Sequence, residues 1–309
     1  MQIIKHDINI DFIGKRKLAM ILSGALILIG LVSLVVNGGP NYGIDFVGGT
    51  LVQVKFSEST DAAKIKDSLA SLDLGSVVVQ RFGDDPNEFL IRVQKDSKSQ
   101  NLSGMISSSL TTVYGEGNVD IRRMEMVGPQ VGKDLRQKGL LSIFYAMIGI
   151  LIYISWRFEL RFAIGAIIAL VHDVLITLGA FSLTGREIDL PIIAAFLAII
   201  GYSLNDTIIV YDRIRENYGK HQKKGFSVVV NRSINETLSR TILTSGTTLL
   251  VVLALFIFGG GVIHNFAFAM LVGILIGTYS SIFVASPVLI FWDDYRSKGK
   301  KQVATEGTA

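Results

Sequence analysis

Six long apolar runs, separated by polar stretches of unequal length, dominate the hydrophobic pattern of the chain. They occupy residues 18–36, 139–156, 162–183, 190–210, 241–258 and 266–291. A run of roughly 20 apolar residues is long enough to cross a bilayer as a helix. We therefore predict six transmembrane helices, of which the last is long enough to tilt or to extend beyond the membrane.

Clusters of Lys and Arg orient these helices. With six spans, all four clusters fall on one side of the membrane. On the opposite side, the short loops 184–189 and 259–265 have Arg186 as their only Lys or Arg. The clusters are Lys15, Arg16 and Lys17; Arg157 and Arg161; Arg213, Arg215, Lys220, Lys223, Lys224 and Arg232; and Arg296, Lys298, Lys300 and Lys301. The positive-inside rule then predicts that both termini are cytoplasmic. Cations before the first run also fit a signal peptide, but the run is long and lacks a small-x-small cleavage site, which favours an uncleaved helix.

This topology divides the chain into five parts. We expect a cytoplasmic N-terminal segment at 1–17, the first transmembrane helix at 18–36, and an extracytoplasmic α+β domain at 37–138. Transmembrane helices two to six follow at 139–292, with a cytoplasmic loop at 213–239 that lies along the membrane face. A solvated, disordered cytoplasmic tail is expected at 293–309.

The polar stretch 37–138 has the pattern of a small folded domain. Period-two alternation indicates strands at 50–56, 76–82, 88–94 and 119–127, and helical spacing indicates helices at 62–72 and 101–113. Thr60 or Asp61 is the expected cap of the first of these helices. The resulting β-α-β-β-α-β order is that of the ferredoxin-like fold. The predicted fold class is therefore a bundle of six transmembrane helices with one small α+β, ferredoxin-like extracytoplasmic domain.

Composition removes several functional classes. Half of the 309 residues are hydrophobic, only 18% are charged, and the mean hydropathy is +0.47, whereas soluble domains carry about 25% charge. Because the chain has no cysteine, it has no cysteine nucleophile, Fe–S cluster or thiolate metal site. The net charge of +4 lies in short clusters beside the apolar runs, so it indicates membrane orientation rather than nucleic-acid binding.

Ionisable residues at membrane depth are functional candidates, because a charge in hydrocarbon is costly. Asp206 lies in the fourth run, and Arg240 begins the fifth. Small and polar residues at helical steps between Ala194 and Asp206 favour a carboxylate that faces the bundle. A carboxylate whose proton affinity changes as an arginine approaches acts as a proton-coupled switch. We predict that Asp206 and Arg240 carry proton transport; a static ion pair is the structural alternative.

Other polar membrane residues are candidates for a supporting role. They are Asp173, Asn205, Thr207, Thr244 and Ser245. Asp173 has a structural alternative, a bond to a neighbouring helix through Thr177 or to a partner. His172 is more often a packing residue than a ligand, and no second His or carboxylate cluster supports a metal site. We predict no catalytic residue, no cofactor and no metal; the coupling ion is a proton or a sodium ion, because carboxylates bind either.

Several long motifs resemble the SecF family, whose members are subunits of the bacterial SecDF accessory complex of the Sec translocase. NYGIDFVGGT at 41–50 resembles the start of the family's extracytoplasmic domain, and VGPQVGKDLRQKG at 127–139 resembles its approach to the second span. The other matches are GYSLNDTIIVYDRIREN at 201–217, INETLSRTILTSGTTLLVVLALFIFGG at 234–260 and FAFAMLVGILIGTYSSIFVASPVLIFW at 266–292. The resemblance extends from about Asp11 to Trp292.

The resemblance implies a place in the bacterial cytoplasmic (inner) membrane and a relationship to the resistance-nodulation-division (RND) transporter superfamily. It implies SecD, the SecYEG translocon and YajC as protein partners, and unfolded exported polypeptides as substrates that are pulled or released with proton motive force. In the family, an aspartate of an NDT motif and an arginine of an SRT motif belong to the proton path; here these positions are Asp206 and Arg240. A further essential aspartate belongs to SecD and is absent from this chain.

Competing functions predict different features. Half of a proton-coupled RND-type exporter of small molecules or lipids would need a large apolar extracytoplasmic pocket. A purely structural assembly factor would tolerate Asp206→Asn. An enzyme ranks last, because no nucleophile, base and orienting group can be assembled from these motifs. The leading hypothesis is a proton-driven, non-enzymatic subunit of a protein-export machine.

Overall fold

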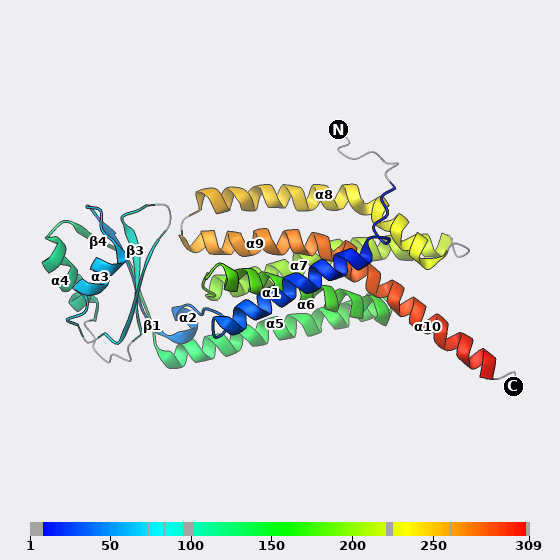
Figure 1. Ribbon diagram of the computed structural model, residues 1–309, viewed down its shortest axis with the longest axis horizontal. Helices are drawn as coiled ribbons and strands as arrows, with labels where there is room; N and C mark the ends of the chain where they lie inside the picture. Colours follow the sequence, from blue (N-terminus) through cyan, green and yellow to red (C-terminus); the bar gives the residue numbers. More distant parts are fainter. Residues whose placement is uncertain are drawn as a thin grey trace.

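The molecule consists of a helical bundle with a small sheet and two helices at one end (Figure 1). The computed structural model describes residues 9–72, 74–82, 85–94, 102–220, 225–259 and 261–306. Residues 1–8 of the predicted N-terminal segment and Lys223 and Lys224 of the third basic cluster lie outside the described residues.

Six helices of the described chain are long and apolar enough to cross a membrane, as predicted. The first five are α1 (Arg16–Val36), α5 (Pro129–Arg157), α6 (Leu160–Leu183), α7 (Leu190–Lys220) and α8 (Phe226–Phe258). The sixth combines α9 (Gly261–Ser280), the π-helical turn η1 (Ser281–Ala285) and α10 (Ser286–Glu306). The chain is therefore a multi-pass membrane protein. Its described N-terminal residues and the far end of α10 both lie away from the sheet (Figure 1).

The domain outside the bundle is built on an antiparallel sheet. Strands β1 (Gly49–Phe56), β2 (Ser76–Arg81), β3 (Glu88–Gln94) and β4 (Val119–Val127) pair in the order β2-β3-β1-β4. Helices α3 (Ala62–Ser68) and α4 (Leu102–Tyr114) share one hydrophobic core with the sheet. Of the two expected N-cap residues, Thr60 and Asp61, it is Asp61 that caps α3. Its Oδ1 accepts a hydrogen bond from the Lys64 N–H at 2.8 Å.

A short helix and two glycines join this domain to the bundle. Helix α2 (Ile44–Val47) ends at Gly48 and Gly49, whose φ angles are 82° and 128°. A Cβ on Gly48 would lie 2.8 Å from the Cα of Pro129, where α5 begins. Only glycine therefore fits this crossing without strain.

Small residues set the closest helix crossings. A Cβ on Gly30 of α1 would lie 2.9 Å from the Cα of Gly179 of α6. On α9, Gly277 receives the side chain of Ser203 of α7, and a Cβ there would lie 2.9 Å from the Cβ of Ser203. The GxxxG sequence of α9 thus serves close packing against α7.

Two segments at the ends of the membrane helices differ from the prediction. Residues 213–239, expected as a loop along the membrane face, are helical where described, because α7 continues to Lys220 and α8 begins at Phe226. The tail expected to be disordered continues α10 to Glu306. Hydropathy indicates where a helix leaves the bilayer rather than where it ends. Exposed pairs at helical spacing, such as Glu216 with Lys220, stabilise the turns outside the membrane.

Candidate polar site in the membrane bundle

Asp206 lies on α7 and turns into the bundle, where it is 5% exposed. Its Oδ2 accepts a hydrogen bond from Ser245 Oγ of α8 at 3.0 Å. Ser245 Oγ accepts in turn from Thr278 Oγ1 of α9 at 2.8 Å. The carboxylate is thus tied to three membrane helices, so a change in its protonation alters the contacts among all of them.

A small cavity adjoins this carboxylate. Its volume is about 40 Å³, and α7, α8 and α9 all contribute to its walls. Asp206, Ser203, Ser245 and Thr278 are among the lining residues. The space is sufficient for one water molecule, and its walls offer the polar partners that a buried water requires.

The predicted partner Arg240 does not pair directly with Asp206. It is exposed on α8, and no ion pair joins these two side chains within the described chain. The charge of Arg240 acts on the carboxylate through space. The structure therefore brings Ser245, one of the predicted supporting residues, into contact with Asp206, and the alternative of a static Asp206–Arg240 ion pair does not hold.

The other supporting residues divide into two groups. Thr207 is buried and donates to the Ser203 carbonyl at 3.0 Å, and Thr244 donates to the Arg240 carbonyl at 3.0 Å. Both hydroxyls thus bond within their own helices. Asn205 is exposed and lines the small cavity with Thr244.

Asp173 belongs to a second polar cluster, deeper in the bundle. Its side chain is 1% exposed, and its Oδ2 accepts from Ser203 Oγ at 2.5 Å and from Ser280 Oγ at 2.8 Å. Thr177, considered as its partner, donates instead to the Asp173 carbonyl at 2.8 Å. His172 is not a simple packing residue, because both of its ring nitrogens have polar partners.

One membrane face of α7 and α8 is polar and uncovered. Tyr202 and Asn205 of α7 are exposed there, as are Arg240, Thr244 and Thr247 of α8. The spacing within each helix places these residues on one side. Such a surface is unfavourable against lipid, so it indicates a partner that covers it.

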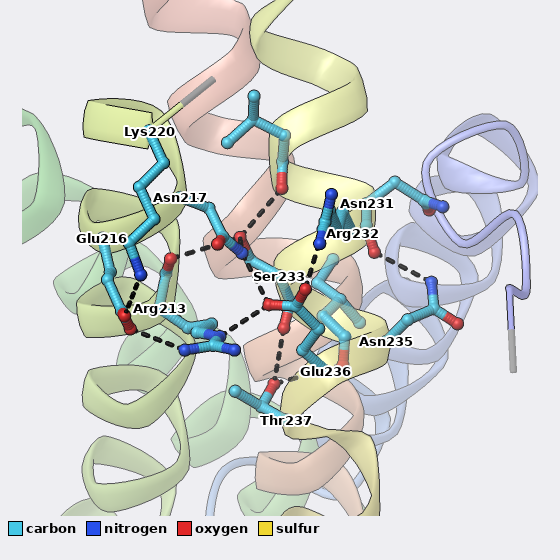
Figure 2. Close-up of polar contacts among 12 residues, drawn as sticks. Arg213, Glu216, Asn217, Lys220, Asn231, Arg232, Ser233, Asn235, Glu236 and Thr237 are labelled. Atoms are coloured by element: carbon cyan, nitrogen blue, oxygen red, sulfur yellow. Dashed lines mark hydrogen bonds and ion pairs between the residues drawn. The ribbon is translucent and has the colours of Figure 1, made fainter. Parts of the chain in front are cut away.

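Outside the bilayer, a charged cluster joins the ends of α7 and α8 (Figure 2). Glu236 of α8 accepts from Arg213 at 2.6 Å and from Asn217 at 2.7 Å, both on α7. Arg213 also bonds Glu216 at 2.6 Å. These contacts hold the C-terminal end of α7, which carries Asp206, against the N-terminal part of α8, which carries Arg240.

Two asparagines of α8 bond the backbone of the segment that precedes α1. Asn235 accepts from the Ile10 N–H at 2.8 Å, and Asn231 accepts from the Phe12 N–H at 2.9 Å. Both side-chain amides also donate to the Ile10 carbonyl. The segment before α1 is therefore fixed by its backbone to the N-terminal half of α8.

At the opposite end, the beginning of α7 meets the external domain. Asp189 Oδ1 accepts from the Ile192 N–H at 3.2 Å, and Asp45 Oδ2 accepts from the Leu190 N–H at 2.9 Å. Arg92 of β3 forms an ion pair with Glu187 in the same loop. The helix that carries Asp206 is thus connected directly to the sheet.

A cavity of about 510 Å³ lies at this junction, between the sheet and the loops of the bundle. Its lining includes charged groups, among them Arg92, Glu187 and Asp189. Burial raises the pKa of the Asp189 carboxyl to about 6, and the neighbouring Asp45 adds to the rise. Burial also lowers the pKa of Arg92 to about 10. Among the residues described, no group of three or more His, Asp or Glu side chains is placed to hold a metal ion.

Comparison with known proteins assigns the chain to a family. Residues 106–295 match the model for "Protein export membrane protein SecD/SecF, C-terminal", and residues 32–60 match the "SecD/SecF GG Motif". The chain is 51% identical to the protein translocase subunit SecF of Magnetococcus marinus, over 99% of this chain and 98% of that protein. The chain belongs to the SecF family. The GG motif of this SecF-family chain includes the Gly48–Gly49 crossing described above.

A second SecF-family relative and a solved structure support the same assignment. The chain is 45% identical to the protein translocase subunit SecF of Vibrio alginolyticus, over 94% of this chain and 91% of that protein. It is similar to the crystal structure of SecDF, a translocon-associated membrane protein from Thermus thermophilus, with a TM-score of 0.85 and 35% identity. That match covers 94% of this chain and 40% of the SecDF chain, so this chain spans about two fifths of the length of SecDF.

Proposed function

We propose that this chain is a proton-motive-force-dependent, non-enzymatic subunit of the Sec export machinery that acts with SecD to pull or release translocating polypeptides outside the cytoplasm. The observation that carries the proposal is Asp206, a buried carboxylate at the junction of three membrane helices beside a cavity for one water. An ionised carboxylate only accepts hydrogen bonds, whereas a protonated one also donates. Protonation would therefore rearrange the Ser245 contact and the packing of α7 against α8.

The uncovered polar face of α7 and α8 supports SecD as the partner. Exposed Asn205, Arg240 and Thr244 need protein contacts at membrane depth. In SecDF, the region similar to this chain is about two fifths of one longer chain, and SecD would supply the covering helices. The family resemblance adds SecYEG and YajC as further partners.

The placement of the basic clusters supports the bacterial inner membrane with both termini in the cytoplasm. The domain at the other end then lies outside the cytoplasm. Its strand order β2-β3-β1-β4 and its two helices packed against the sheet support the ferredoxin-like fold.

The start of α7 supplies a physical route from the proton site to this domain. Asp45 bonds the first turn of α7, and Glu187 just before the helix pairs with Arg92 of β3. A displacement of α7 would therefore move the sheet. Strands β2 and β4 lie at the edges of the sheet, and an edge can bind an extended polypeptide of any sequence by strand addition.

The cavity at the junction does not favour an exporter of small molecules or lipids. Charged side chains from both the sheet and the membrane loops line it, whereas solute pockets are mostly apolar. In the export proposal, these charged walls form the contact between two parts that move, the sheet domain and the membrane bundle.

The decisive experiment measures export into inverted membrane vesicles that carry Asp206→Asn together with its SecD partner. Late translocation is followed with and without an imposed proton gradient. We expect the gradient to accelerate wild-type release and to have no effect on the variant, because asparagine cannot exchange the proton. Asp212→Asn, at a half-exposed carboxylate of the same helix, is the matched control and should keep the full response.

Two further arms complete the test. Co-purification with SecD shows that the Asp206→Asn complex assembles, which separates coupling from assembly. Replacing the proton gradient with a sodium gradient should give no acceleration. A full proton response in the assembled Asp206→Asn complex would contradict the proposal and favour a structural assembly factor.

A further inference from the structure

A buried histidine and aspartate share the interior of the bundle with four hydroxyl groups. His172 is 5% exposed and Asp173 is 1% exposed. The His172 Nδ1 lies 2.9 Å from Asp173 Oδ1, and its Nε2 lies 3.0 Å from Ser23 Oγ of α1. Ser23 Oγ lies 3.1 Å from the hydroxyl of Tyr279 on α9. This chain of contacts crosses from α6 to α1 and α9.

The hydrogen-bond acceptors in this series of contacts show which groups carry the hydrogens. The Tyr279 hydroxyl donates to the carbonyl of Ala19 at 2.7 Å, because a carbonyl oxygen can only accept. Ser23 must then donate to Tyr279, so the Ser23 oxygen accepts from His172. The Nε2 atom of His172 therefore carries a hydrogen.

The contact between His172 and Asp173 requires one more proton. With Nε2 protonated, a neutral ring would turn the lone pair of Nδ1 toward Asp173 Oδ1, and two acceptors at 2.9 Å repel each other. The other carboxylate oxygen, Oδ2, is occupied by the Ser203 and Ser280 hydroxyls. A proton must therefore lie between Nδ1 and Oδ1.

We propose that His172 and Asp173 form a proton-holding site whose shared proton is taken up and released during the transport cycle. The proposal rests on the proposed role of Asp206 and extends it to a second site. Uptake places one proton on the Nδ1–Oδ1 contact and changes the net charge of the pair from −1 to zero. No other bond is made or broken.

Ser203 connects this pair to the Asp206 cavity. It precedes Asp206 by one turn of α7, it donates to Asp173, and it lines the cavity of about 40 Å³. Ser203 thus joins the Asp206 cavity to the Asp173 carboxylate through a single hydroxyl. Gly277 faces Ser203 and keeps the crossing close, since a Cβ there would lie 2.9 Å from the Cβ of Ser203.

Among the described residues around Asp173, the charge that can neutralise its carboxylate is a proton. Helices α1, α5, α7, α9, η1 and α10 pack against α6. Of these, α9 brings a titratable group to the pair, Tyr279, whose ring stacks on His172 at 6.1 Å between centroids. Helix α7 brings Asp206 only through Ser203. In the described part of the chain, the one basic side chain paired with Asp173 is His172, which is charged only when both ring nitrogens carry hydrogens.

The test is nitrogen NMR of the full chain with its SecD partner, labelled with ¹⁵N-histidine and reconstituted in bilayers. The chain has four histidines, and His172→Gln identifies the ring signals of His172. We expect these signals to report both a ring with two N–H groups and a ring with one N–H group. The fraction with two N–H groups should fall in Asp206→Asn, because a neighbouring negative charge is removed. It should stay unchanged in the Asp212→Asn control.

Ser203→Ala tests the connection without emptying the core. In that background, Asp206→Asn should change this fraction less, because the hydroxyl that joins the two sites is gone. A His172 ring found in one protonation state alone would overturn the proposal. An equal fraction in wild type and Asp206→Asn would overturn it as well.

Vesicle export separates this inference from the proposed function. Asp173→Asn should remove the benefit of the proton gradient from an assembled complex, as Asp206→Asn does. If Asp206→Asn leaves that benefit intact, the proposed function fails whatever the NMR result. If Asp206→Asn abolishes it while the His172 ring is found in one protonation state alone, only the second site fails.

Discussion

At the scale of single residues, serine hydroxyls surround both buried membrane carboxylates. Ser245 bonds Asp206, and Ser203 and Ser280 bond Asp173. A hydroxyl can donate to an ionised carboxylate and accept from a protonated one. An arginine in direct contact would favour the ionised form alone. Serine contacts therefore suit carboxylates that exchange a proton.

Asp189, at the start of α7, gives a prediction that concerns pH. Its pKa in the folded chain is raised to about 6 from an ordinary value of 3.8. Between these values the folded chain holds a proton that the unfolded chain has lost, so stability falls as pH rises from about 4 to about 6. Above that window, Asp189→Asn should be more stable than wild type by about 1–2 kcal/mol, because it removes the cost of the buried charge and keeps an N-cap.

The measurement is the difference in melting temperature between Asp189→Asn and wild type in detergent across this pH range. The two proteins should melt together near pH 4, and the variant should melt a few degrees higher at pH 7. Asp212→Asn should show no such divergence. A constant difference at all pH values would mean that the Asp189 carboxyl does not titrate in this window.

Several of these residues could be predicted from the sequence, and others could not. Asp206 could be predicted from the sequence, because a single carboxylate in an apolar run is conspicuous in any fold. The contact of His172 with Ser23 joins positions 149 residues apart, and no periodic pattern encodes such a pairing. Arg240 was predicted to act with Asp206 in proton transport, but the sequence does not give the distance between them, and charge alone does not reveal that Ser245, five residues further along α8, contacts the carboxylate.

At the scale of elements, the helices are held by close crossings as much as by apolar area. Lipid is as apolar as a leucine side chain, so membrane helices associate through packing and hydrogen bonds. Gly30 and Gly179 bring α1 and α6 into backbone contact. That approach also places Ser23 of α1 beside His172 of α6. The elements themselves follow from the apolar runs, but helix ends outside the bilayer, such as those of α7 and α8, depend on polar contacts like that of Arg213 with Glu236.

Gly179→Ala should therefore destabilise the bundle. Its Cβ would lie 2.8 Å from the Cα of Gly30, so α1 must move away from α6. We expect a loss of about 1–3 kcal/mol, typical of overpacking. Gly149→Ala in α5 is the matched control, because nothing lies within 4 Å of its Cβ. Thermal unfolding of the purified variants measures both, and equal melting temperatures would contradict the predicted backbone contact.

At the scale of the whole molecule, the external domain is fastened to the bundle at the beginning of one membrane helix. The sheet contributes Arg92, the loop before α7 contributes Glu187, and the short helix α2 contributes Asp45. The other end of α7 is fixed to α8 by Glu236. Asp206 lies between these two anchors, so its protonation acts on a helix whose C-terminal end is held by α8 and whose N-terminal end contacts the sheet domain.

This arrangement predicts that the proton-driven step needs the contact between the sheet and the loop before α7. Because the chain has no cysteine, Arg92→Cys with Glu187→Cys removes the ion pair and creates a thiol pair that a reducible bis-thiosulfonate can bridge. Without the bridge, the acceleration of export by a proton gradient should fall, bridging should restore it, and reduction should remove it again. Lys55→Cys with Asp85→Cys replaces an ion pair of 2.6 Å within the sheet domain, and neither its bridging nor its reduction should change the acceleration. If the unbridged Arg92→Cys and Glu187→Cys variant keeps full acceleration, α7 does not move the sheet through this contact, and substrate must be released by motion elsewhere in the complex.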